Sequence, residues 1–129
     1  MRRESITLTT QAGPKTISAE IAKSAPEQEQ GLMFRTHIGD DDGMLFVYGK
    51  PQEINMWMRN TYIALDMVFI GADGRVARIE EHAEPLSDRV ISSGAMVLSV
   101  LELKAGTARR LGLQRGDSIA APSLPAIAP

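Results

Sequence analysis

Short segments in which apolar and polar residues alternate, separated by turns, constrain the fold of this chain most. Ile6 and Leu8 alternate with serine and threonine, and residues 16–22 repeat the pattern after a Gly-Pro turn within 11–14. A period of two is typical of a strand with one buried face, so these two segments predict a hairpin. The chain is therefore expected to be built mainly from antiparallel strands.

More strands are predicted further along the chain, at residues 44–48, 54–59, 66–70, 75–81, 96–103 and 118–121. The segment 66–70 is almost entirely apolar, which is typical of a strand covered on both faces. Gly-Ala-Asp-Gly at 71–74 predicts a tight hairpin turn, and the irregular alternation of 75–81 is compatible with a β-bulge.

Two short helices are predicted between these strands. Ser24 followed by Glu27 forms a capping-box pattern, and Gly31 ends the first helix. Thr107 is the expected cap of a second helix that ends before Gly112. The expected fold class is mainly β with two short helices (α+β), as a small, antiparallel-rich, partly closed barrel, because closure removes exposed strand edges.

The 129 residues fit one domain, expected at 1–121, followed by a Pro/Ala-rich tail at 122–129 that is expected to fray. A net charge of −2 and scattered arginines argue against nucleic acid as a partner. The absence of cysteine excludes a disulfide scaffold and a thiolate nucleophile. No apolar run approaches the ~20 residues of a transmembrane helix. The charged segment 1–5 has no apolar stretch behind it, so this chain shows no signal peptide.

A candidate ligand-binding site is predicted where a strand runs into a bend, at Trp57, Arg59, Asn60, Thr61 and Asp66. Alternation places Trp57 on the polar side of its strand, where its ring is a platform for a sugar or another flat group. Arg59 can hold an anion, and Asn60 both donates and accepts hydrogen bonds. The structural alternative is that Asn60 and Thr61 shape a turn while Asp66 accepts hydrogen bonds from backbone N–H groups.

Asp66 and Glu102 are the candidate catalytic residues if the protein is an enzyme. Both stand beside apolar strand residues, and burial raises the pKa of a carboxyl group. A pair of carboxyls that flank one bond suits glycoside cleavage. The alternative is that Glu102, between Leu101 and Leu103, is the outward residue of an alternating strand.

Methionine is unusually frequent, and thioethers suit Cu(I). The six methionines of the chain's body are Met33, Met44, Met56, Met58, Met67 and Met96. All six stand in apolar segments, where methionine fills irregular core space, and neither His37 nor His82 has another histidine at ligand spacing. No metal site is therefore predicted. The chain has no phosphate-cradling glycine loop either, and no cofactor is expected.

Several motifs in order resemble a known family. They are Gly31 to Arg35, Gly43 to Phe46, Trp57 to Thr61 with Leu65-Asp66, Gly74 to Val76, and Leu101 to Leu103 with Ala105-Gly106. Together they resemble the bacterial and archaeal domain of unknown function family number 192, across residues 17–119. Met56, Arg59 and Ala64 depart from the family's common phenylalanine, lysine and proline.

The resemblance implies a compact β-rich domain, commonly exported, and hence an extracytoplasmic location. Residues 107–117 also resemble the helix and Gly-Asp turn of cradle-loop barrels, which says nothing about chemistry. The leading hypothesis is a small extracytoplasmic binding or accessory module, not an enzyme, whose partner is a small molecule or an envelope polymer. The alternatives are a cell-envelope polysaccharide hydrolase or lyase with a carboxylate pair, and a methionine-rich copper-binding protein.

Overall fold

The computed structural model describes residues 1–127. Its elements, in order, are β1 (Arg3–Thr10), β2 (Gly13–Ala22), α1 (Ala25–Gln30), β3 (Asp42–Gln52), β4 (Asn55–Met56), β5 (Leu65–Ile70), β6 (Val76–Ala83), β7 (Ile91–Ser92), β8 (Val97–Lys104), α2 (Thr107–Leu111) and β9 (Ser118–Ala120). The fold is therefore mainly β with two short helices, as expected. Among the described residues no helix is long and apolar enough to cross a bilayer.

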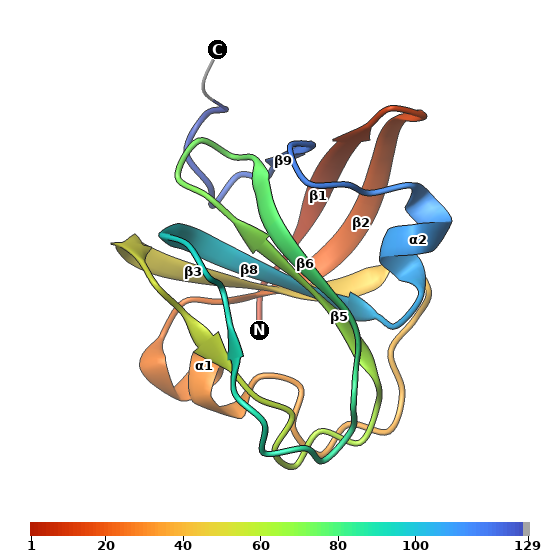
Figure 1. Ribbon diagram of the computed structural model, residues 1–129, viewed down its shortest axis with the longest axis vertical. Coiled ribbons are helices and arrows are strands. Elements are labelled where there is room, and N and C mark those ends of the chain that lie inside the picture. The colour runs from red at the N-terminus through yellow and green to blue at the C-terminus, as the bar shows by residue number, and fades with distance from the viewer. Residues whose placement is uncertain (128–129) are drawn as a thin grey trace.

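Most strands belong to one mixed sheet in the order β6-β5-β8-β3-β2-β1-β9, and β4 pairs only with β7. Its pairs are antiparallel except for β2 and β3, which run parallel. The sheet bends strongly, so that β1 and β2 run across the direction of β3 and β8 (Figure 1). A bridge between Arg75 and Ser118 and backbone hydrogen bonds between residues 74–76 and 116–119 connect its two ends. No closed barrel is found among residues 1–127, so the partly closed barrel is not confirmed.

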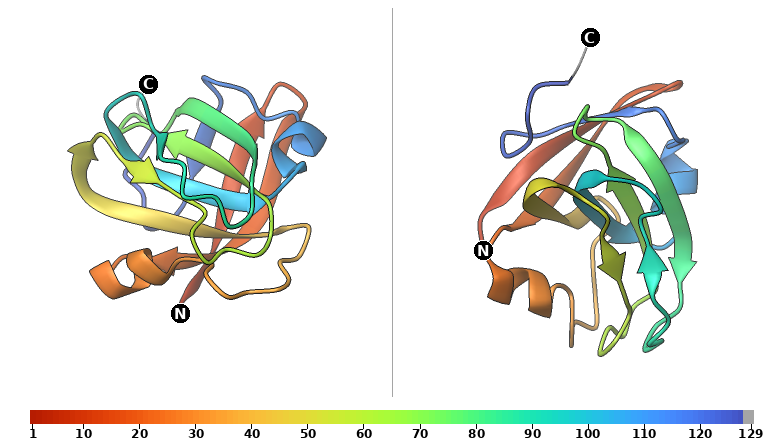
Figure 2. Two further views of the ribbon diagram at one scale, coloured as in Figure 1. Left: turned by 60° about the horizontal axis from the view of Figure 1, so that its bottom comes forward. Right: turned by 60° about the vertical axis from the view of Figure 1, so that its left-hand side comes forward.

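Two hydrophobic clusters pack on opposite faces of this sheet. Adjacent side chains of β3 point to opposite faces, since Leu45 belongs to the first cluster and Phe46 to the second. The first cluster includes residues of β1, β2 and α2, and the second includes Phe46 of β3 and Ile91 of β7. The helices α1 and α2 lie apart, on different sides of the molecule (Figure 2). All six residues of β5 are buried, as the continuous apolar pattern of 66–70 predicted, because this strand contributes to both clusters.

Several local predictions are confirmed. Residues 3–22 form the predicted hairpin, and β6 contains register shifts against β5. Ser24 caps α1 through a complete capping box with Glu27. Gly112 ends α2 in the left-handed conformation, with a φ of 72°.

Other local predictions differ from the structure. The strand expected at 54–59 is reduced to Asn55–Met56, because Thr61 N–H donates to the Met58 carbonyl and closes a turn. Thr107 is not the cap of α2; Gly106 stands there with a φ of 92°. In the tail, Ser123 donates its backbone N–H and hydroxyl to Glu4, while 128–129 lie outside the described residues.

Candidate functional site

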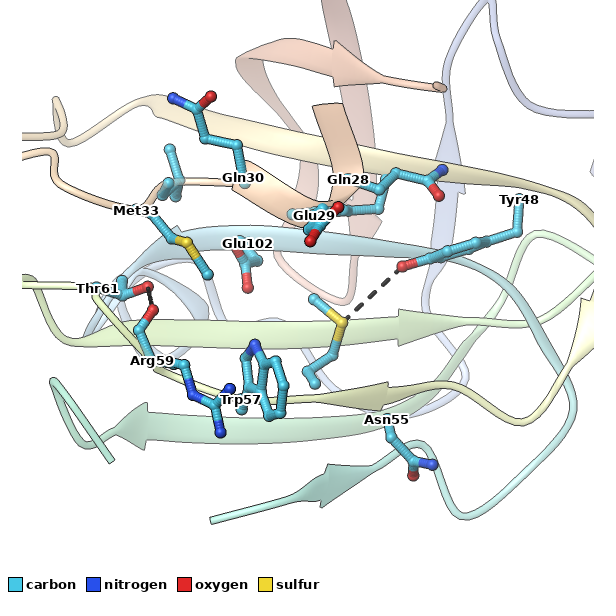
Figure 3. A pocket seen from close by; sticks show the side chains of 14 residues that line it. Gln28, Glu29, Gln30, Met33, Tyr48, Asn55, Trp57, Arg59, Thr61 and Glu102 are labelled. Carbon is cyan, nitrogen blue, oxygen red and sulfur yellow. Dashed lines mark hydrogen bonds between the residues drawn. The ribbon is translucent and has the colours of Figure 1, made fainter. Parts of the chain in front are cut away.

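A pocket of about 270 Å³ opens on the face of the sheet that carries the second hydrophobic cluster. Its walls come from α1 and the turn after it, from β3, and from the segment 55–61. Glu102 of β8 lies among the lining residues, with Met33 and Gln30 on one side and Trp57 on the other in the view of Figure 3. We call this hollow the Glu102 pocket.

The carboxyl group of Glu102 is held in an apolar setting. Glu102 stands opposite Met44 of β3 and Met67 of β5, and both methionines are fully buried. Only 4% of the Glu102 surface is exposed, and no hydrogen bond or ion pair joins its carboxyl to another residue within 1–127. Burial raises the pKa of Glu102 to about 8. The group is therefore mostly protonated at neutral pH and offers one O–H donor to the pocket.

Trp57 and Arg59 form one rim of the pocket. Trp57 is 44% exposed, while the guanidinium carbon of Arg59 lies 3.8 Å from the centre of its ring. The same guanidinium donates to Asp88 over 3.0 Å. Arg59 thus stacks on Trp57 and forms an exposed ion pair with Asp88, which partly offsets its positive charge at the rim.

Asn60 and Thr61 contribute mainly through the turn that they form. Asn60 has a φ of 55°, and its carbonyl accepts a 2.8 Å bond from Phe34 N–H, which ties this turn to the segment after α1. The Thr61 side chain is 6% exposed, borders the pocket and donates to the Arg59 carbonyl. Thr61 therefore lines the Glu102 pocket, whereas Asn60 lies outside it.

Asp66 lies on the other face of the sheet and has a structural environment. Its carboxylate accepts hydrogen bonds from the backbone N–H groups of His82, Gly106 and Ala108, at 2.9 to 3.1 Å. These bonds fix the start of α2, which matches the structural alternative stated above. Asp66 stands opposite Leu103 and Met67 opposite Glu102, so Asp66 and Glu102 point to opposite faces. The structure does not bring the proposed carboxylate pair together.

The methionines are placed as core and lining residues. Met44, Met58 and Met67 are buried in the second hydrophobic cluster, and Met56 packs against it. Met33 and Met56 also line the Glu102 pocket, whereas Met96 is 64% exposed and does not. Among residues 1–127, no three histidine or acidic side chains are grouped to hold a metal ion.

Two pocket residues have no signal in the sequence. The side-chain amide of Gln28 donates to the carbonyls of Ala22 and Val47, which fastens α1 over the sheet and leaves its oxygen to accept. The Tyr48 hydroxyl donates weakly to the sulfur of Met56. Burial, and to a smaller extent the charge of the nearby Glu102, raise the pKa of Tyr48 to about 12. Gln28 reaches the pocket because the parallel β2–β3 pairing places α1 over the sheet, and no local pattern reveals that pairing.

Fold and site together define a small β-rich domain with a polar–aromatic pocket that contains a buried glutamate, Glu102. The chain belongs to the family DUF192, described as "Uncharacterized ACR", whose model matches residues 6–121. The family resemblance of the motifs is thereby confirmed. No curated protein matches the chain.

Two crystal structures show the same fold over most of their length. A protein from Sinorhizobium meliloti 1021, described as a "putative transcription regulator", is 42% identical, with a TM-score of 0.92 over 95% of this chain and 96% of that one. A protein of unknown function from Novosphingobium aromaticivorans DSM 12444 is 40% identical, with a TM-score of 0.88 over 90% and 83% of the two chains.

Proposed function

We propose that this protein is a binding module for a small uncharged ligand that carries hydroxyl or carbonyl groups. The observation that carries this proposal is the buried, unpartnered carboxyl of Glu102 in a pocket whose rim is the exposed ring of Trp57. Within residues 1–127 no hydrogen bond uses this carboxyl, and Glu102 lines the pocket, where a bound ligand can reach it. A ligand oxygen that accepts the Glu102 proton would supply the missing bond.

Catalysis by a carboxylate pair is less well supported than binding. Glu102 has the raised pKa of a general acid, but its expected partner, Asp66, is bound to three backbone N–H groups on the opposite face. A glycosidase needs both carboxyls beside one bond. The carboxylate pair expected from the sequence is therefore absent from the Glu102 pocket, whose other carboxyl side chain, Glu29, is exposed on α1.

Nucleic acid is an unsuitable partner for this surface, although one relative is described as a regulator of transcription. The chain's net charge is −2. Most of the arginines with a described partner are paired with carboxylates, as Arg35 is with Glu20 and Arg110 with Asp41. Phosphate binding requires unpaired positive charge on one face. An extracytoplasmic location is part of the proposal, rests on the family resemblance alone and remains a prediction.

The proposal is tested by measuring ligand affinity as a function of pH. A thermal-shift screen with neutral monosaccharides of the cell envelope, including N-acetylglucosamine, and with Cu(I) as the alternative, selects the ligand, because native-state binding raises Tm. Titration calorimetry then compares pH 6 and pH 9. We expect affinity to fall about tenfold at pH 9, one unit above the pKa of about 8, because deprotonated Glu102 cannot donate.

Glu102→Gln is the matched control, since an amide donates at every pH. This variant is expected to bind the ligand with an affinity that does not change between pH 6 and pH 9. Stabilisation by Cu(I) alone, or a pH profile that is the same in both proteins, would overturn the proposal.

A further inference from the structure

A second hollow adjoins the Glu102 pocket and shares a wall with it. It has a volume of about 510 Å³ and adds Pro26, Phe34 and Asn60 to the lining. The residues common to both hollows are Glu29, Gln30, Met33, Trp57 and Arg59. The two hollows therefore adjoin at the Trp57 side chain. We refer to them together as the cleft, from Glu102 to Phe34, and call its outer part the Phe34 groove.

Exposed aromatic rings gather at this outer part. The chain has only six aromatic residues, and three of them, Phe34, Trp57 and Tyr62, are between 44% and 58% exposed. The rings of Phe34 and Tyr62 meet edge to face with centroids 6.1 Å apart. The backbone of Phe34 is held in place because its N–H donates to the Asn60 carbonyl. A ring that is exposed and yet held in place indicates a surface that contacts a partner.

The backbone at this groove has an unusual conformation that keeps Phe34 outside the core. Phe34 has a φ of 67°, in the left-handed region that residues other than glycine rarely adopt. Its neighbour Leu32 is 3% exposed and belongs to the second hydrophobic cluster. The conformation costs Phe34 free energy and leaves its ring more than half exposed, and the backbone bond to Asn60 holds it there.

The polar groups of the cleft indicate the chemistry of its occupant. Amide groups of Gln30 and Asn60 both donate and accept hydrogen bonds, as sugar hydroxyls do. Glu29 is a carboxylate, and the guanidinium of Arg59 is paired with Asp88. The cleft therefore has no surplus of positive charge for a polyanion. Flat rings beside groups that donate and accept suit the apolar faces and hydroxyl edges of sugars.

We propose that the cleft binds a linear, uncharged oligosaccharide, with one sugar in the Glu102 pocket and the next ones over Trp57 and Phe34. This inference rests on the proposed function and adds to it the ligand class and a second subsite. In this proposal the ligand is the envelope polymer that the family resemblance led us to expect, and the Glu102 pocket holds one unit of it.

The test is a chain-length series measured by titration calorimetry. The probes are N-acetylglucosamine, its β-1,4-linked dimer and its tetramer, beside glucose and the corresponding cello-oligosaccharides. In one of the two series we expect affinity to rise about tenfold or more from monomer to tetramer, because added rings contact Trp57 and Phe34. Extended peptides of similar length serve as the competing class and are expected not to bind.

Phe34→Asn separates the two subsites. Asparagine tolerates a left-handed φ, so the backbone is retained while the ring is removed. We expect this variant to bind the monomer within twofold of the wild type and to lose most of the gain shown by the tetramer. Val90→Ala, at another strongly exposed apolar residue outside the cleft, is the matched control and should change neither affinity.

The outcomes distinguish this inference from the proposed function. If a monomer binds at Glu102 but the tetramer binds no more tightly, the Phe34 groove is not a subsite and the proposed function stands. Equal loss of monomer and tetramer affinity in Phe34→Asn also overturns the second subsite. Binding of a peptide in place of the oligosaccharides overturns the ligand class. If no sugar of either series binds, this inference fails, and the proposed function falls only if the wider pH test fails as well.

Discussion

At the scale of single residues, Glu102 should govern how the protein's stability depends on pH. Its pKa is raised from 4.5 to about 8 in the folded state, so the native protein holds a proton that the unfolded chain releases. Stability therefore falls as pH rises from about 4.5 to about 8, by roughly 1.4 kcal/mol per pH unit. Glu102→Gln removes this loss and is expected to be more stable than the wild type at pH 8 by several kcal/mol.

Urea denaturation at pH 5, 7 and 9 measures this difference. The expected pattern is a small gap between variant and wild type at pH 5 that widens at pH 7 and is constant above about pH 8. Glu84→Gln, at an exposed glutamate, is the control and should leave the pH profile unchanged. Parallel profiles for Glu102→Gln and the wild type would show that Glu102 is ionised in the folded protein.

From the sequence, the chemistry of these residues could be predicted better than the face of the sheet on which each side chain lies. The alternation of 54–59 placed Trp57 on the exposed side and Met58 inside, as the structure has them. It did not show that Asp66 and Glu102 face opposite ways, because the face of each depends on the register of β5 against β8. The apolar neighbours of Glu102 agree equally with an outward residue and with a buried one, and the latter is what the structure has.

At the scale of elements, α1 is the wall of the Glu102 pocket that depends most on local interactions. None of its residues is buried, so it is held by the Ser24–Glu27 capping box and by the amide of Gln28. Ser24→Ala is expected to destabilise this helix by about 1 kcal/mol. Native-state hydrogen exchange should then be about fivefold faster at the backbone amides of Gln28 and Gly31, and unchanged in β8.

Ser24→Asp is the matched variant, because aspartate caps a helix as well as serine does. Its amides in α1 should exchange at the wild-type rate. Uniformly faster exchange through β8 in Ser24→Ala would contradict the prediction, since it would place α1 within the global unfolding unit.

Elements set by local patterns were predictable, and those set by distant partners were not. The capping box at Ser24 and the turn at 71–74 are each complete within a few residues, and both are present. The parallel pairing of β2 with β3 joins segments about 24 residues apart and leaves no local trace. It is this pairing that places α1 above β3 and β8 and so creates the wall of the pocket.

At the scale of the whole molecule, the central strands connect the two hydrophobic clusters into one cooperative unit. β3, β5 and β8 each contribute residues to both hydrophobic clusters, so neither cluster can be lost while the other remains packed. The pattern of short strands predicted a mainly antiparallel, partly closed barrel, and the closure is not confirmed among the described residues. Closure depends on contacts between 74–76 and 116–119, which the structure limits to one bridge and a few hydrogen bonds.

The cleft and the sheet are therefore expected to unfold together in a single transition. The only tryptophan, Trp57, reports on the cleft by fluorescence, and far-UV circular dichroism reports on the sheet. Leu45→Ala removes side-chain volume from the first cluster, on the face opposite the cleft, and should cost about 2–5 kcal/mol. Phe46, the next residue of β3, belongs to the second cluster, so destabilising the first cluster also destabilises the second. The unfolding midpoints measured by fluorescence and by circular dichroism should therefore fall by the same amount. If the midpoint measured by Trp57 fluorescence is unchanged while the midpoint measured by circular dichroism falls, the cleft unfolds independently of the sheet beneath it.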